Sequence, residues 1–245
     1  CLKIIEKDPS NLQARLLLAG IYSTLQNRDT AIEEYTAILR QAPGSDEVYL
    51  YLNNLYLESG DYKKARENMR AYARLQPDSP IPDYYLGRIY AQEEDFKNAE
   101  KSYRKALQHE PEHEATLMEL AALYELRKDA DRAIATYRQI LAYYPEHAGA
   151  RNHLAQLYLQ EGRLDKALEQ YRQLDEIVVD NDPVRMRMGL ILMEQKNYDG
   201  AIADFSAVVG RDPGNDKARY FLGLAHEAKK DWERSLAEFE KITPG

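Results

Sequence analysis

Apolar residues recur along the chain at intervals of three and four, and polar residues separate them. In the segment 84–92, Leu86, Ile89 and Tyr90 have this spacing, and the segment 96–107 repeats it. Such a period is typical of amphipathic helices, each with one face directed to a core. Short polar turns interrupt the pattern, several of them with a glycine where a helix must stop. The pattern therefore predicts pairs of amphipathic helices joined by short turns.

The helix-pair pattern itself returns with a fixed period of 34 residues. Prolines mark this period, at residues 9, 43, 77, 111, 145 and 213, and Val179 occupies the one missing place. A proline ends a helix because it has no N–H to donate and its ring clashes with the preceding turn. A period of this length is the signature of stacked helical units, none of which can bury its apolar face without its neighbours. The sequence thus predicts an open array of repeats that works by binding.

Five positions keep their residue type when each repeat is counted from the third residue after its proline. Position 7 is large and apolar, at Leu18, Leu52, Leu86, Leu120, Leu154, Met188 and Leu222. Position 8 is mostly small, at Ala19, Asn53, Gly87, Ala121, Ala155, Gly189 and Gly223. Position 11 is Tyr in the first five repeats, position 20 is Ala in six of seven, and position 24 is aromatic except at Met69. Small residues let two helices approach closely, and the aromatic rings fill the space that remains.

This set of positions resembles the tetratricopeptide repeat, and the resemblance covers essentially the whole chain. It implies an all-α fold, a right-handed superhelix (α-solenoid) of about seven helix-turn-helix repeats. We expect one solenoid over residues 1–245, opening with the tail of a second helix at residues 1–9. The predicted repeats are 12–45, 46–79, 80–113, 114–147, 148–181, 182–215 and an incomplete 216–245.

The resemblance also implies a binding face. In this family, positions 2, 5, 9 and 12 of the first helix line the concave side of the superhelix. Here the implied peptide-binding residues are Leu50, Asn54, Leu57, Ile81, Tyr84, Arg88, Met118, Asn152, Gln156, Met186, Leu190, Met193 and Tyr220. Exposed apolar side chains mark interaction surfaces, and Met adapts to its partner. The family's chaperone-tail clamp would need Lys where Leu50 stands, which argues against that class of partner.

These features favour a non-enzymatic scaffold or adaptor that holds a peptide or a helix of a protein partner. One alternative is a structural protein that self-assembles end to end, and another is the docking region of a larger enzyme. For the end-to-end contact the sequence offers an apolar set in the last repeat: Phe221, Leu224, Trp232, Leu236, Phe239 and Ile242. Such a head-to-tail contact would give homo-oligomeric filaments or rings.

Charge and motifs narrow the chemistry further. A net charge of −8 argues against a nucleic-acid partner, and mixed charges along each helix predict a solvated outer face. No motif for catalysis, a cofactor or a metal is present. His109, His113 and His147 lie on separate turns, which favours surface residues over metal ligands. The run 180–182 lacks calcium-loop spacing, and we expect Asp182 to cap a helix with Pro183 in its first turn.

Cys1 is the only cysteine, which excludes an internal disulfide. Two hypotheses for it stay open. One is a lipidated first residue, as in processed bacterial lipoproteins, with Leu2 matching an outer-membrane sorting pattern; this would place the protein in the periplasm, anchored to the outer membrane. The other is a small core residue at position 24 of a longer chain, which would leave the protein cytoplasmic. Membrane contact is expected only through the lipid of the first hypothesis.

Overall fold

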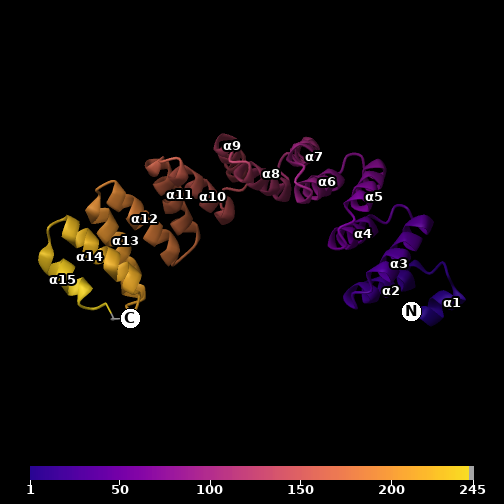
Figure 1. The fold of residues 1–245 in the computed structure, drawn as a ribbon, viewed down its shortest axis with the longest axis horizontal. Coiled ribbons are helices and arrows are strands. Elements are labelled where there is room, and N and C mark those ends of the chain that lie inside the picture. The colour runs from indigo at the N-terminus through magenta and orange to yellow at the C-terminus, as the bar shows by residue number, and fades with distance from the viewer. Residues whose placement is uncertain (243–245) are drawn as a thin grey trace. The chain divides into compact units, whose positions relative to one another are not determined.

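The computed structural model describes residues 1–242, and this part of the chain folds into fifteen α-helices and no strands (Figure 1). The last three residues of the predicted repeat 216–245 lie outside the described residues. The helices are α1 (Leu2–Lys7), α2 (Leu12–Thr24), α3 (Arg28–Gln41), α4 (Asp46–Glu58), α5 (Tyr62–Leu75), α6 (Ile81–Gln92), α7 (Phe96–His109), α8 (Glu114–Leu126), α9 (Ala130–Tyr143), α10 (Ala148–Gln160), α11 (Leu164–Ile177), α12 (Asp182–Glu194), α13 (Tyr198–Arg211), α14 (Asp216–Ala228) and α15 (Trp232–Phe239).

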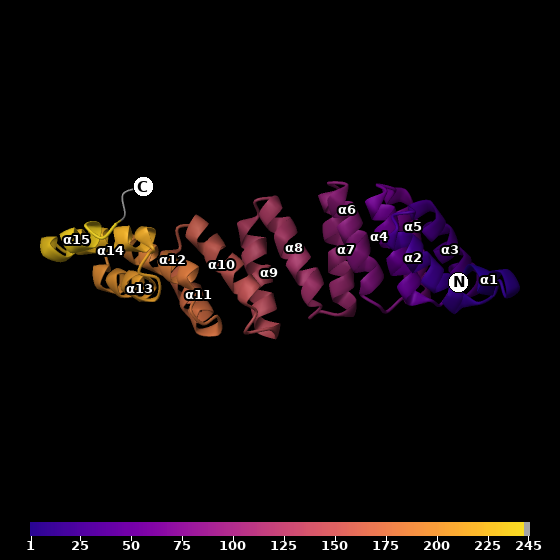
Figure 2. The ribbon, with the colours of Figure 1, turned by 90° about the horizontal axis from the view of Figure 1, so that it is seen from below.

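After α1, the helices alternate between two kinds. The even-numbered helices are the first of each predicted pair and are called helices A; the odd-numbered helices α3 to α15 are helices B. Within each of the two compact units described below, helices pack on their neighbours in chain order, which Figures 1 and 2 show from two sides. This confirms the predicted all-α fold of about seven helix-turn-helix pairs.

Local sequence signals place the ends of these helices. Asp61 and Asp95 each accept a hydrogen bond from a backbone N–H of the first turn of a helix B, at 3.0 and 3.2 Å. Gly60 and Gly162 have φ of +72° and +67°, so glycine stands where the backbone between helices A and B is left-handed. One expectation is wrong: Asn181, not Asp182, caps α12, because its Oδ1 lies 3.2 Å from the Val184 N–H.

The predicted pairing of small and aromatic residues lies in the core of every repeat except the second, which has Asn53 and Met69 in these places. A Cβ added at Gly87 would lie 2.4 Å from the Tyr103 ring, and one at Gly189 would lie 2.5 Å from the Phe205 ring. The position 20 alanines, such as Ala99, are fully buried beside them. Any larger side chain at these places would force helix A away from helix B.

The helices group into two compact units, Cys1–Arg127 and Lys128–Gly245. Within the first unit, buried side chains from successive helices join across repeats; for example, Ile38 of α3 lies in one cluster with Leu52 and Leu55 of α4. A single solenoid over residues 1–245 stays a prediction. Within residues 1–242, none of the helices has the length and apolar character needed to cross a membrane.

Candidate functional site

The predicted peptide-binding residues all lie on helices A, and every one of them is exposed or half-buried. In the first unit they come from α4, α6 and α8; in the second unit they come from α10, α12 and α14. The core residues of the same helices are buried, as Leu52 and Leu86 illustrate. Each unit therefore presents a row of accessible side chains along its helices A, separate from its core.

In the first unit, this row contains a group of rings on α6. Tyr84 lies 5.1 Å from Tyr85, centroid to centroid, and 5.5 Å from His113. The guanidinium of Arg88 lies 5.8 Å from the centroids of both tyrosine rings, and its Nε is 3.7 Å from Oε1 of Glu119. Burial raises the pKa of Tyr84, so the phenol stays neutral. This group offers a preordered aromatic surface with a cation on top of it.

In the second unit, the row is more aliphatic. Met186, Leu190 and Met193 lie along α12, and Leu190 is exposed. The amide of Asn152, predicted to bind a peptide backbone, already accepts a hydrogen bond through Oδ1 from Arg187 Nη1 at 3.2 Å. Its Oδ1 is therefore partly engaged, and a bound peptide would have to share it.

Position 6 of helix A also contributes to this surface, and our sequence reasoning missed it. Tyr51 stacks on Tyr35 of the preceding helix B with centroids 5.4 Å apart, and Phe221 stacks on Phe205 at 5.7 Å. In a third repeat the residue is Arg187, whose guanidinium lies 5.8 Å from the centroid of the Tyr171 ring. The position varies in residue type between repeats, so a search for constant positions could not find it. Its constant neighbour, the position 24 aromatic, was the available signal.

A hollow of about 690 Å³ on α2 is a second feature that the sequence did not reveal. Gln13, Leu16 and Gly20, at positions 2, 5 and 9, line one part of it, and a Cβ at Gly20 would have no neighbour within 4 Å. Apart from Thr24, the rest of its lining is apolar or aromatic: Leu17, Ile21, Leu25, Tyr35 and Tyr51. The hollow opens where α2 has little covering it.

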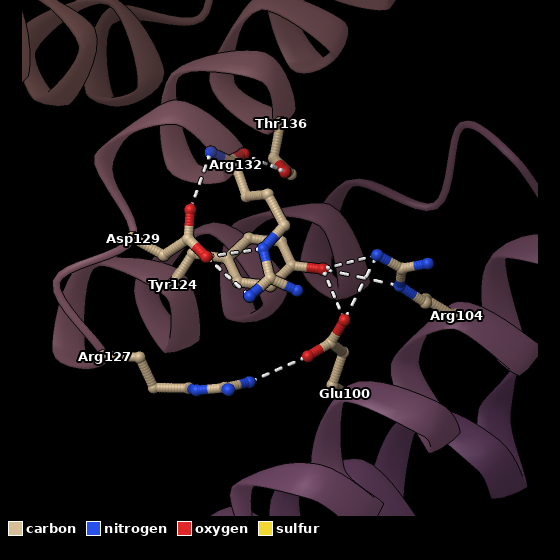
Figure 3. Close-up of polar contacts among 7 residues, drawn as sticks. All are labelled: Glu100, Arg104, Tyr124, Arg127, Asp129, Arg132 and Thr136. Carbon is tan, nitrogen blue, oxygen red and sulfur yellow. Dashed lines mark hydrogen bonds and ion pairs between the residues drawn. The ribbon is translucent and has the colours of Figure 1, made fainter.

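A polar cluster between α7 and α8 has a structural role (Figure 3). Tyr124 Oη donates to Glu100 Oε1 at 3.1 Å and accepts from Arg104 Nη2 at 3.1 Å. Glu100 Oε2 accepts from Arg127 Nη1 at 2.8 Å. The cluster joins a helix B to the next helix A and so fixes their register. In the second unit, Asp129 Oδ2 accepts a hydrogen bond from Arg132 Nε at 2.6 Å in the first turn of α9.

Two of the three histidines considered as metal ligands cap helices, and the third, His109, ends α7 with Nε2 3.8 Å from Asp83 Oδ2. His113 Nδ1 accepts from the Thr116 N–H at 3.2 Å, and His147 Nδ1 accepts from the Ala150 N–H at 2.9 Å. Among residues 1–242, no group of three or more His, Cys, Asp or Glu side chains is placed to hold a metal ion. Cys1 is half-buried and its backbone carbonyl accepts hydrogen bonds from the first turn of α1. Its lipidation stays a prediction.

The residues predicted for an end-to-end contact separate into two groups. Trp232 and Leu236 are exposed on α15, with 62% and 59% of their surface accessible. Phe239 packs inside its own repeat, since a Cβ at Gly223 would lie 2.5 Å from its ring. Phe221 stacks on Phe205, and Leu224 and Ile242 are half-buried. Only α15 therefore offers strongly exposed members of this set.

Two family models, both described as tetratricopeptide repeat, match the chain. One matches residues 90–139 and 126–188, and the other matches residues 54–114 and 186–244. The chain belongs to the tetratricopeptide repeat (TPR) family. No curated protein sequence matches it.

Several solved TPR structures resemble the chain at low sequence identity, which shows the shared fold alone. A TPR protein from Parabacteroides merdae has a TM-score of 0.57 and 21% identity, over 82% of this chain and 81% of that one. YrrB, described as a TPR protein with an unusual peptide-binding site, has a TM-score of 0.53 and 18% identity, over 80% and 97%. The structure of the Cut9-Hcn1 hetero-tetramer has a TM-score of 0.53 and 16% identity, over 91% of this chain and 44% of that one.

Proposed function

We propose that this TPR protein is a non-enzymatic scaffold that holds an extended peptide or a helix of a protein partner against its helices A. The observation that carries this proposal is that the family-implied contact residues on α4 and α6 are accessible, while the core residues of the same helices are buried. TPR repeats typically mediate protein–protein interactions, and YrrB, which has the same fold, is described as having a peptide-binding site.

The chemistry of the surface indicates how it would bind. On α4, Leu50 and Leu57 flank the exposed Asn54, so apolar contacts would lie on either side of an amide that can pair with a peptide backbone. On α6, Tyr84 and Arg88 form the preordered ring and cation described above. Rigid aromatic side chains and Arg are the residues that most often dominate binding energy. A partner with apolar side chains and a carboxylate or an acidic residue fits this combination.

A random peptide library selected on the unaltered protein tests the proposal. Affinity of the recovered peptides is then measured by fluorescence anisotropy. We expect Leu50→Ala to weaken binding about tenfold, which corresponds to ~1.4 kcal/mol. Asn54→Glu should weaken it as well, because it replaces the amide with a charge that a peptide carbonyl repels.

Leu75→Ala is the matched control, since Leu75 is an exposed leucine on α5, a helix B, where no contact is proposed. Its peptide affinity should equal that of the unaltered protein. Peptides that bind the Leu50, Asn54 and Leu75 variants equally well would exclude the helix A surface of the first unit as the binding face.

A further inference from the structure

In both units, the position 10 residue of every helix A except α2 is buried, and in α4 and α6 it lies in one cluster with side chains of the preceding helix B. Leu55, Ile89 and Leu123 illustrate this in the first unit, with 6%, 0% and 4% of their surface accessible. The corresponding residue of α2 is Ile21, which is 42% accessible. One face of α2 is therefore built like the others and covered much less.

Ile21 belongs to an apolar row along α2. Leu17 and Leu25 lie one turn before and after it, with 60% and 70% of their surface accessible. Residues four apart on a helix lie on one face, so the three form a continuous stripe. This stripe lines the hollow of about 690 Å³ together with Tyr51. Exposed apolar surface of this kind marks an interaction site.

The residues that would meet this stripe at an interior junction are known from the other repeats. Position 21 of a helix B contacts the next helix A: Ile32 packs in the cluster that contains Leu55, Arg66 pairs with Glu93, and Glu100 pairs with Arg127. In α15 this residue is Leu236, 59% accessible, with Trp232 one turn before it. The outward face of α15 is thus the face that helices B direct at a following helix A.

The two faces match in chemistry. At the interior junctions α5–α6 and α7–α8, position 14 of helix A is charged, as Glu93 and Arg127, and it meets an opposite charge on helix B. On α2, position 14 is Leu25, and on α15 the opposing residue is Leu236. An apolar residue faces an apolar residue, so burying this pair leaves no charge without a partner.

We propose that the outward face of α15 in one copy packs on the apolar stripe of α2 in a second copy, in the place that helices B take at interior junctions. Trp232 and Leu236 of one copy then cover Leu17, Ile21 and Leu25 of the other. The contact is head to tail, so each copy keeps one unused face and further copies can add. This self-association is independent of peptide binding on α4 and α6.

Size-exclusion chromatography with light scattering across a concentration series tests the contact. The mass of the unaltered protein should rise with concentration. Leu25→Glu and Leu236→Glu should each remain monomeric, and both side chains are exposed, so helicity and melting temperature should be unchanged. Leu75→Glu, an equally drastic change of an exposed leucine outside the contact, should associate like the unaltered protein.

A mixture of the two variants separates a head-to-tail contact from a symmetric one. The Leu25→Glu copy retains an intact α15 and the Leu236→Glu copy retains an intact α2, so together they should form one contact, while the two introduced glutamates repel each other at the other contact and the mixture stops at a dimer. An unaltered protein that is monomeric at every concentration overturns the proposal. So does a variant that still associates alone, or a mixture that contains only monomers.

Discussion

At the scale of single residues, the sequence predicted the packing well at positions where only a very small side chain fits. Gly87 and Gly189 sit under aromatic rings at distances that exclude any Cβ, so the small-aromatic pattern had a direct steric cause. The second repeat departs from the pattern on both sides at once. Asn53 takes the small position and Met69 takes the aromatic one, and both are fully buried. Neither polar atom of the Asn53 amide has a hydrogen-bond partner.

This departure leads to a prediction for the pair. Met69→Tyr alone should destabilise the protein by about 1–3 kcal/mol, because the ring needs the space that Asn53 occupies. The double variant Asn53→Ala, Met69→Tyr should be more stable than the unaltered protein by about 1 kcal/mol. It restores the pairing of Ala19 with Tyr35 and removes an unpaired buried amide, which costs about 1–3 kcal/mol.

Urea unfolding of the unaltered protein, both single variants and the double variant measures this coupling. The two changes should be strongly non-additive, since the residues are neighbours that compete for one space. Additive effects would contradict the steric reading. Asn68→Ala is an informative comparison, because the buried Asn68 amide donates to the Tyr49 carbonyl at 2.7 Å and its loss should only destabilise.

At the scale of elements, helix pairs and turns were predictable because their sequence signals are local. The side-chain hydrogen bonds that join one helix to another were not predictable. In three repeats, an Arg at position 4 of helix A connects the preceding proline loop to helix B. Arg219 donates through Nη2 to the Pro213 carbonyl at 2.5 Å and through Nη1 to Glu238 at 2.8 Å. Arg151 makes the same contacts with Pro145 and Gln170, at 2.5 and 3.1 Å.

These arginines correct the expectation of a wholly solvated charged face, since Arg151 and Arg219 are both buried. The signal was present in the sequence as an Arg at position 4 that accompanies Glu, Gln or Asp at position 23. In the sequence, such an Arg resembles an ordinary surface charge, because its partner lies 19 residues away and is not on the same helix. Only the folded helix pair brings them together.

The repeat that lacks the proline also departs from this tie. Arg185 pairs with Asp175 instead, at 3.1 Å from Nε to Oδ1 and 3.0 Å from Nη2 to Oδ2. Asp204 holds position 23 of this repeat. Burial raises the pKa of Asp204 to about 6, and the nearby Asp175 charge adds to the effect of burial, while Arg185 only partly offsets it.

A pH dependence follows, and its sign is set by the raised pKa. The folded protein holds the Asp204 proton more tightly than the unfolded chain does, so this residue destabilises the fold at pH 7. The destabilisation fades progressively as the pH falls from about 6 towards 3.8. Asp204→Asn should therefore stabilise the protein at pH 7 by about 1–2 kcal/mol and have little effect near pH 4.

Thermal melting of both proteins between pH 4 and 8 checks this prediction, with the difference between them isolating Asp204 from the other carboxylates. Glu238→Gln is the opposite control, because hydrogen bonds from Lys241 and Arg219 lower the pKa of Glu238 despite its burial. That variant should lose stability at pH 7. A difference between Asp204→Asn and the unaltered protein that does not change with pH would contradict the assignment.

At the scale of the whole molecule, the period of 34 residues predicted that each helix packs on the helices next to it in sequence. The structure shows why the period does not predict which helix faces stay accessible. Each helix contacts mainly the helices before and after it. What a face does therefore depends on what lies next to it: Ile21 and Leu55 hold the same position, yet one is accessible and the other is buried. No pattern within a repeat distinguishes the two. For the same reason the accessible stripe of α2 became evident only from the structure, whereas the sequence had already indicated Trp232 and Leu236 of α15.

Nearest-neighbour packing also predicts how the molecule responds to damage. Ala99 of α7 and Ala201 of α13 are equivalent residues, both fully buried, one in each compact unit. Replacing either with Leu should overpack its helix pair and lower the free energy of unfolding by about 1–3 kcal/mol.

In a repeat array, the free energy of unfolding is close to a sum of local terms, so the loss of stability should stay near the substitution. Hydrogen exchange followed by mass spectrometry should show faster exchange in α6–α8 for Ala99→Leu, with α12–α14 unchanged, and the reverse for Ala201→Leu. Each variant serves as the control for the other. Equal acceleration across all helices in both variants would mean that the chain unfolds as one cooperative unit, contrary to this prediction.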